Sequence, residues 1–221
     1  MSYLTLLQDL HRESGIAGAA PTSVTGLSGM PAKLAAWIVS AWQEIQSARK
    51  WAFLRKEADV LLTAGKRDYM LLADLGIADV REIDQTFAVV MLPDGSDMGR
   101  LSWLPYTDFR DRYGLSTPET ARPSVATLIL PTQLRLNTLP DQAYKLRISY
   151  WRTATVLAAA SDEPTITTEE QAVILWRALM FYAAHEGAAD VFADAQAKYK
   201  SAFALLTQRY LPQIGFGAPL A

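Results

Sequence analysis

The sequence contains no cysteine and only two histidines, at positions 11 and 185. The absence of thiols excludes disulfide bridges, thiolate zinc sites and cysteine nucleophiles together. His185 and Glu186 begin like the helical zinc-protease motif, but the second histidine would have to stand where the chain has Ala189. His11 is remote in the sequence and lies on a segment with an apolar face. We therefore expect no metal site.

A surplus of positive charge is also missing, since 21 Lys and Arg residues face 23 Asp and Glu residues and the net charge is −2. A protein that holds DNA tightly through its phosphates usually carries a basic surplus. The aromatic ring flanked by basic residues is Trp51, which stands near Arg49, Lys50, Arg55 and Lys56. Acidic neighbours such as Glu44, Glu57 and Asp59 oppose a base-stacking site there. We expect no specific binding of nucleic acid.

Long hydrophobic runs are absent as well. No stretch approaches the roughly 18 apolar residues of a membrane-spanning helix. Asp9 and Glu13 interrupt the N-terminal region where a signal peptide would be apolar. We expect neither a membrane span nor a signal peptide, and the lack of cysteine fits an intracellular setting.

The signatures of common enzymes are incomplete. Gly65 is followed by lysine, but Val60 stands where a phosphate loop needs its first glycine, and Arg67 replaces the required serine or threonine. No nucleophile elbow accompanies the serines. An enzymatic alternative would depend on carboxylates such as Asp108 or Glu119, yet the run DFRDRY indicates a self-neutralising exposed helix. We expect no catalytic residue and no cofactor.

Apolar residues spaced by three and four positions predict helices at both ends of the chain. The expected ranges are 3–14, 31–49, the region from Pro164 to about Glu186, and a last helix that Pro212 stops. Thr167 and Glu170 have the spacing of a capping box, and Gly187 is expected to separate the last two helices. Gln46 is placed with the polar side of the second helix.

Large apolar side chains fall on the inner stripes of these helices, where core packing is the default interpretation. The predicted packing residues are Trp37, Trp42, Trp176, Met180 and Phe203. We expect them to join the second helix to the terminal pair, with Trp51 marking the junction into the middle of the chain.

The middle of the chain has strand patterns. We predict a hairpin with its turn near Gly65, then a strand at 86–92 and a long hairpin tip at 93–99 with LSWLP as the returning strand. A short helix at 105–114, capped by Thr107 and Gly114, is followed by a three-stranded antiparallel meander. Its strands are expected at 124–131, 133–140 and 143–152.

The predicted fold class is therefore α+β, with an antiparallel β-rich insertion in a helical bundle built from the N- and C-terminal helices. The bundle is expected to comprise residues 1–50 and 164–211, and the insertion residues 51–163. Residues 212–221 form an apolar tail rich in glycine and proline that cannot continue the last helix.

Several local sequences, in this order, resemble those of the bacteriophage head–tail adaptor family. They are AWQEIQSARKWAFLR, LPYTDFRDRYG, ARPSVATL with LRLNTLPDQAYKLRISYWR, and RALMFYAAHEGAADVF. The resemblance covers nearly the whole chain and implies a virion structural protein made in the host cytoplasm and located at the head–tail junction. It implies a dodecameric ring of copies between the portal protein and a downstream tail or nozzle protein, with DNA passing through and no catalysis.

The resemblance also implies where the partners bind. In such adaptors the C-terminal segment docks onto the portal, and the corresponding residues here are Leu211, Ile214, Phe216, Pro219 and Leu220. The β-rich part tends to face the next tail component, so the residues expected at that distal contact are Pro93, Asp94, Asp97 and Met98. A tail-completion or stopper connector is the alternative nearest in function.

A β-rich module that recognises a glycan or a protein is an alternative from another class. Trp103, Tyr106 and Tyr113 could form its aromatic platform. Substituting them would abolish ligand binding under that hypothesis and leave assembly unchanged.

Overall fold

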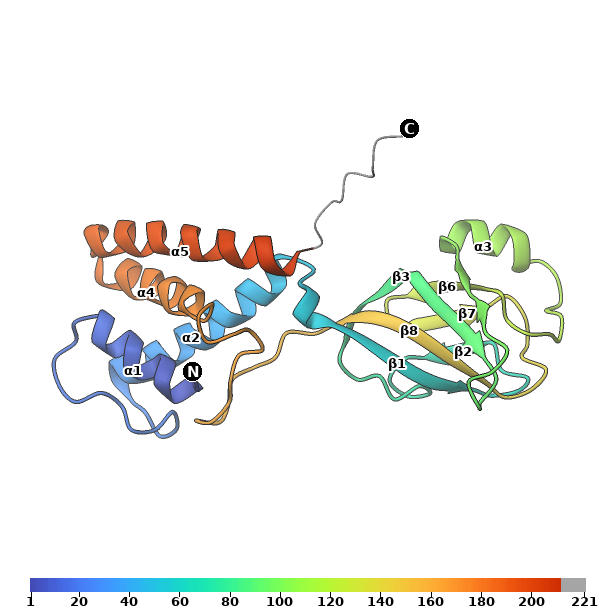
Figure 1. Cartoon of the computed structure of the whole chain (residues 1–221), viewed down its shortest axis with the longest axis horizontal. Helices are drawn as coiled ribbons and strands as arrows, with labels where there is room; N and C mark the ends of the chain where they lie inside the picture. Colours follow the sequence, from blue (N-terminus) through green and yellow to red (C-terminus); the bar gives the residue numbers. More distant parts are fainter. Residues whose placement is uncertain (212–221) are drawn as a thin grey trace, which may run out of the picture. The chain divides into compact units, whose positions relative to one another are not determined.

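The computed structural model describes residues 1–211, and the chain divides into two compact units (Figure 1). Within the described residues, the helical unit comprises 1–53 and 154–211, and the β unit comprises Leu54–Thr153. Helices at both ends and strands between them confirm the predicted α+β class. None of the helices within residues 1–211 is long and apolar enough to cross a membrane.

The long helices of the helical unit are α1 (Tyr3–Glu13), α2 (Gly29–Ala48), α4 (Ala172–Glu186) and α5 (Ala189–Tyr210). Helix α2 contacts α1 and α4, and α4 forms an antiparallel pair with α5 (Figure 1). Gly187 ends α4 in the left-handed conformation, with φ of 69°, as its sequence position predicts. Leucines 6, 7 and 10 of α1 and Leu34, Ile38 and Ile45 of α2 are fully buried, so apolar stripes hold these helices together.

The segment after the β unit packs with the helices, which corrects the predicted end of the insertion at residue 163. Gln46 of α2 is fully buried, and its amide donates to the carbonyl oxygen of Thr155 and accepts from the Thr155 N–H, both at 2.9 Å. The backbone N–H of Tyr3 donates to the carbonyl of Asp162 at 2.8 Å. Placing Gln46 on the polar side of α2 was therefore wrong, because its amide replaces water with backbone partners.

The predicted capping box at Thr167 lies ahead of the helix and does not cap it. The Glu170 carboxylate accepts from the Thr167 N–H at 3.2 Å and from its hydroxyl at 2.8 Å, but α4 begins only at Ala172. The contact therefore closes the turn that precedes α4.

The β unit contains two four-stranded sheets, ordered β1-β8-β3-β4 and β2-β7-β6-β5. Their bounds are β1 Arg55–Leu62, β2 Asp68–Met70, β3 Val80–Met91, β4 Gly99–Arg100, β5 Ser102–Trp103, β6 Val125–Leu130, β7 Gln133–Leu136 and β8 Tyr144–Arg152. A short 3-10 helix, η1 (Ala52–Leu54), precedes them. The two sheets share one hydrophobic core, to which Val60 and Leu146 contribute from one sheet and Tyr69 and Leu134 from the other.

Three predicted strand pairings are wrong. Strand β1 pairs with β8 and β2 with β7, so the turn near Gly65 joins two sheets and closes no hairpin. Strands β6 and β7 pair as predicted, but β8 leaves the meander and lies between β1 and β3 in the other sheet. The LSWLP segment does not return as the partner of β3 either, because its strand β5 pairs with β6 in parallel and β3 pairs with β4. Burial of the apolar face of each strand in the shared core decides these pairings, and it outweighs the local hairpin signals.

Helix α3 (Tyr106–Tyr113) lies where a short helix is predicted, but Thr107 does not cap it. Pro105 occupies the N-cap position, and no side chain bonds there. Gly114 closes the other end by donating its N–H to the carbonyl of Arg110 at 2.7 Å. Phe109 is the buried residue of this helix and anchors it to the β unit.

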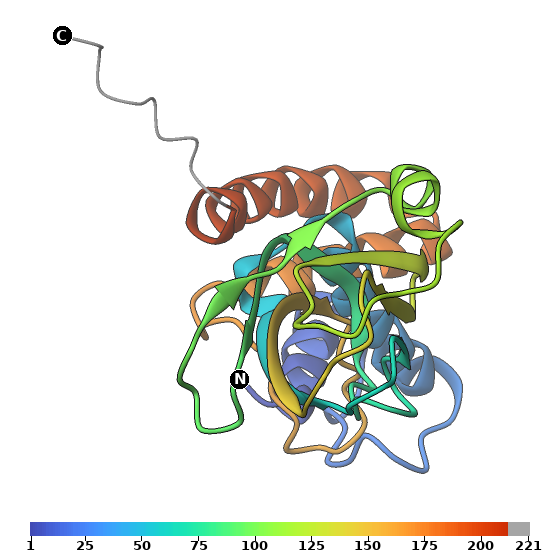
Figure 2. The same cartoon turned by 90° about the vertical axis from the view of Figure 1, so that its right-hand side faces the viewer.

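The ends of the β1–β8–β3 sheet are distinct. At one end Arg55 lies opposite Trp151, where the chain enters and leaves the unit. At the other end Met91 lies opposite Lys145, and β3 continues into the loop that leads to β4. The loop projects from the sheets in Figure 2, where the β unit faces the viewer.

Candidate interaction surfaces

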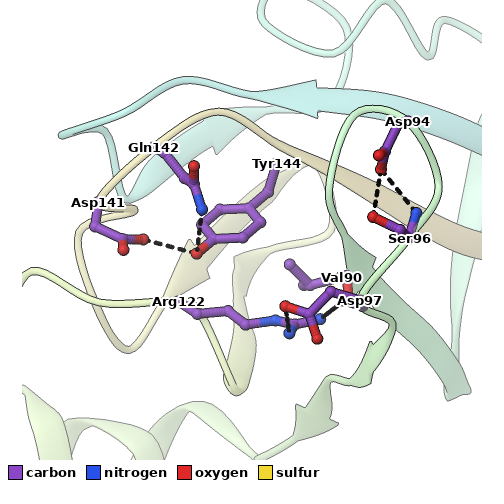
Figure 3. A network of polar contacts seen from close by, with 8 residues as sticks. All are labelled: Val90, Asp94, Ser96, Asp97, Arg122, Asp141, Gln142 and Tyr144. Atoms are coloured by element: carbon purple, nitrogen blue, oxygen red, sulfur yellow. Dashed lines mark hydrogen bonds and ion pairs between the residues drawn. The ribbon is translucent and has the colours of Figure 1, made fainter.

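The loop between β3 and β4, residues 92–98, is the expected distal contact, and we call it the tip. Its first turn is closed by Leu92, whose N–H donates to the carbonyl of Ser96 at 2.9 Å and whose own carbonyl accepts from Gly95 at 2.8 Å. The Asp94 carboxylate accepts from the Ser96 N–H at 2.8 Å and from its hydroxyl at 2.7 Å (Figure 3). These bonds hold the pKa of Asp94 below its ordinary value.

Arg122, from the segment before β6, fixes the second half of the tip. Its guanidinium donates to the Asp97 carboxylate at 2.9 Å and to the backbone carbonyls of Asp97 and Val90 (Figure 3). Asp97 has a φ of 49°, a left-handed conformation that is uncommon outside glycine, and the three contacts stabilise it. A side chain at position 99 would approach the guanidinium to 2.8 Å, so the contact also requires Gly99.

The Tyr144 ring supports the Arg122 guanidinium. Its ring centroid lies 5.8 Å from the guanidinium carbon, in a cation–π arrangement, and its hydroxyl donates to Asp141 at 2.8 Å (Figure 3). Burial raises the pKa of this phenol above its ordinary value. The tip is therefore held by residues far from it in sequence, and no motif in the tip itself would reveal Arg122.

The opposite end of the same sheet has its own polar cluster. Asp79 accepts from the Lys56 ammonium at 2.7 Å and from the Tyr150 hydroxyl at 2.8 Å. The Lys56 bond is the main cause of a pKa of Asp79 below its ordinary value. Burial, reinforced by the Asp79 carboxylate, raises the pKa of Tyr150 to about 12. The cluster ties β1, β8 and the start of β3 together where the chain enters the unit.

A second candidate surface lies where α5 ends, next to the predicted portal-docking tail. Glu170 accepts from Arg209 at 2.9 Å and from the Tyr210 hydroxyl at 2.7 Å. Burial opposes its ionisation, but these bonds and those from Thr167 outweigh it, so the pKa of Glu170 lies below its ordinary value. A surface hollow of about 340 Å³ lies beside this contact, with Leu205 65% exposed at its wall.

Of the five residues predicted to dock onto the portal, Leu211 is half-buried at the end of α5, where its N–H donates to Thr207 at 3.1 Å. The other four, Ile214, Phe216, Pro219 and Leu220, lie outside the described residues.

Of the predicted packing residues, Trp42 and Met180 are buried, whereas Trp37, Trp176 and Phe203 are partly exposed. Trp42 stacks on Phe53 with ring centroids 5.9 Å apart, and Phe53 in turn stacks on Trp51 at 5.8 Å. Trp51 meets Phe203 edge to face at 5.6 Å. A continuous aromatic chain thus runs from α2 to α5 through Phe53, a residue that the helical stripes did not include.

The outer tryptophans meet polar groups. Trp37 lies 5.5 Å from the ring of His185, whose Nε2 is 2.9 Å from the Lys33 ammonium. Trp176 lies under the Lys198 ammonium, 4.5 Å from its ring centroid. Each ring is covered by a cationic or polar neighbour at the surface of the helical unit.

The structure also places the residues on which the alternative functions depend: base stacking on Trp51, an aromatic platform at Trp103, Tyr106 and Tyr113, and a metal site. Trp51 is fully buried and its indole N–H donates to Ile45 at 2.6 Å, so no base can stack on it. Trp103 packs against the core of the β unit and the Tyr113 ring lies against that of Phe109, with centroids 5.2 Å apart, so Tyr106, at 39%, is the exposed ring of the three. Within residues 1–211, no three His, Asp or Glu side chains are grouped as a metal site would require.

The described residues thus define a two-unit α+β protein with a hydrogen-bonded tip on its β unit and a polar contact at the end of α5. Residues 1–217 match the sequence model of the SU10 adaptor protein family, and the chain belongs to that family. The match confirms the predicted resemblance to phage head–tail adaptors and makes the chain a phage structural adaptor. The search of curated proteins found no match.

Proposed function

We propose that copies of this chain form a ring, a dodecamer, beneath the portal protein, link the capsid to the tail, and surround part of the DNA conduit. The observation that carries the proposal is the family match over residues 1–217. The net charge of −2 is compatible with the conduit role. Phosphate contacts would retain DNA that has to slide, and a slightly acidic chain offers few of them.

The two candidate surfaces take separate parts in this proposal. The C-terminal segment from Leu211 onward docks onto the portal, and the tip contacts the downstream tail or nozzle protein. A rigid tip supports that assignment, because a loop ordered before binding loses little conformational entropy on docking.

The first test is the native mass of the purified chain, alone and mixed with the portal ring of its phage. Twelve copies joining one portal are expected, and a free monomer would mean that the portal templates the ring. A chain that stays monomeric and ignores the portal would refute the proposal.

A truncation tests the docking segment separately. Deleting residues 212–221 should leave the helical unit folded, because the truncated chain keeps the fully buried side chains that pack its helices together, such as Leu34, Trp42 and Ile174. The deletion should abolish binding to the portal. Normal portal binding by the folded, truncated chain would refute the assignment of the segment.

A further inference from the structure

The short segment 99–104, which contains β4 and β5, lies between β3 and β6 and bonds to both strands. The N–H of Leu101 donates to the carbonyl of Ala88 in β3 at 3.0 Å. The N–H of Leu104 donates to the carbonyl of Ala126 in β6, also at 3.0 Å. An extended backbone therefore bridges the edges of the two sheets along this part of their length.

This bridging segment ends before β3 and β6 do. The chain leaves its line at Pro105, the N-cap residue of α3. Because β4 runs antiparallel to β3 and β5 parallel to β6, a longer segment would next reach residues 81–83 of β3 and Leu128 of β6. A hollow of about 390 Å³ lies there, lined by residues 81–83 and 128–131, and we call it the edge slot.

The backbone of Leu128 faces the edge slot. The carbonyl of Ala126 accepts from Leu104 on the β5 side, whereas that of Val125 accepts from Asn137 on the β7 side. Alternate residues of a strand direct their N–H and C=O groups to the same side, and the pairing with β7 is regular as far as Leu128. Within residues 1–211, β5 pairs with Val125 and Ala126, and no strand pairs with β6 on this side beyond them. The N–H of Leu128 therefore lies on an open strand edge.

The wall of the edge slot is apolar apart from Arg81 and Glu82, whose charges are opposite. Ile83 is 2% exposed and belongs to the core of the β unit, and Leu128 packs against that core. Leu130, also in the wall, is 56% exposed. An open strand edge beside apolar side chains is a site at which a further strand can pair.

We propose that the edge slot receives a strand from another protein chain of the assembled particle, which continues the line of the bridging segment and pairs with β6 at Leu128. The bridging segment itself shows that the edges of β3 and β6 accept an extended backbone between them. Residues 128–131 give room for about four residues of such a strand, with an apolar side chain facing Ile83. A helix would bond to neither edge, because its backbone groups are bonded internally. This inference rests on the adaptor function proposed above and adds a binding site to it.

Amide hydrogen exchange, measured by mass spectrometry, tests the pairing directly. It is compared in the purified full-length chain, in the purified chain that lacks residues 212–221, and in purified tailed particles. Peptides that contain Leu128 should exchange about fivefold or more slowly in the particles than in the purified chain, because its N–H gains a hydrogen bond. Unchanged exchange in particles that contain the chain would overturn the inference. Slower exchange in the purified full-length chain than in the truncated chain would overturn it too, because the chain's own C-terminal segment would then fill the slot.

Complementation of a phage with a nonsense mutation in the gene for this chain tests whether the site is used. Cells supply the wild type, Leu130→Lys or Leu130→Val. Leu130 is exposed, so both variants should keep the urea midpoint of the purified wild type. A lysine on a strand edge opposes pairing with another strand, so Leu130→Lys should lower the titre of infectious particles about tenfold or more. Leu130→Val keeps the apolar wall and should give a normal titre.

A normal titre with Leu130→Lys would overturn the inference, as would an equal loss with Leu130→Val. If Leu130→Lys lowers the urea midpoint, the exchange comparison decides, since it uses the unsubstituted chain. Absence of the wild-type chain from the particles would instead refute the adaptor function itself, and the inference with it.

Discussion

Replacing Gln46 by leucine should lower the free energy of unfolding of the helical unit by about 2–4 kcal/mol. The Gln46 amide is buried and makes two bonds of 2.9 Å to the backbone of Thr155. Each bond contributes about 0.5–1.5 kcal/mol, and a buried polar group left unpaired costs about 1–3 kcal/mol. Thr155 is only partly buried, so in the variant water can replace some of the hydrogen bonds that its backbone loses. The total loss of stability therefore stays near the lower end of these values. Leucine keeps most of the side-chain volume, so a cavity adds little.

The matched control is Gln43→Leu, one turn earlier on α2. Gln43 is partly exposed, and a substitution there should change the free energy of unfolding by no more than about 0.5 kcal/mol. Urea unfolding is followed by far-UV circular dichroism, which reports mainly the helical unit. Because two compact units can unfold in separate steps, the helical transition is fitted by itself.

The comparison of the two variants decides whether the reasoning holds. If Gln46→Leu and Gln43→Leu unfold at the same urea concentration, the contact between α2 and Thr155 does not hold the returning segment. The assignment of residues 154–163 to the helical unit would then lose its main physical support.

Three further outcomes follow from the same contacts. Trp42→Ala should destabilise the helical unit by about 3–5 kcal/mol, and an unchanged melting curve would contradict its place in the core. Arg122→Ala should speed amide hydrogen exchange in the tip. The control Arg110→Ala, which loses an exposed pair with the neighbouring Asp111, should leave these exchange rates unchanged. Equal exchange rates in the two variants would contradict the role of the Arg122 contacts in holding the tip. Asp79 has a lowered pKa, so its contribution to stability is present at neutral pH and is lost progressively as the pH falls below about 4, the ordinary pKa of an aspartate. Asp79→Asn should have a lower urea midpoint than the wild type at pH 7, and the difference between the two midpoints should shrink as the pH falls through the lowered pKa of Asp79. A difference between them that is constant with pH would refute that reasoning.

The helices could be predicted from the sequence because their signals are local. The range 31–49 corresponds to α2 at Gly29–Ala48, and 3–14 corresponds to α1 at Tyr3–Glu13. Apolar residues three and four positions apart can face a common core only in a helix. Gln46 was missed because it is polar, although its position four residues after Trp42 was a signal that it lies on the buried side.

Strand pairing could not be predicted in the same way, because partners are chosen over long distances in the chain. The strand expected at 86–92 is the second half of β3, which begins at Val80. An irregularity between Ile83 and Ala88 interrupts the alternation of the strand. It contains the buried Asp84, which accepts from Thr86 and pairs with Arg55 at 2.8 Å, a partner that only the folded chain brings close.

The candidate surfaces were found in part. The tip was named from a resemblance and its turn residues, but the sequence offered no reason to connect it with Arg122, 25 residues beyond Asp97. Only the hydrogen bonds reveal that the two acidic residues of the tip are engaged within the loop.

The pairing of Arg55 with Trp151 has a consequence for the modularity of the chain. Directly opposite residues of antiparallel strands have Cα atoms about 4.5–5.5 Å apart. The two points where the β unit joins the helical unit therefore lie only a few ångströms apart. The number of residues in the β unit adds little to the entropic cost of bringing the two parts of the helical unit together. A lineage could lengthen, shorten or exchange this insertion without redesigning the bundle, so the β unit can diverge while the helices keep their own core.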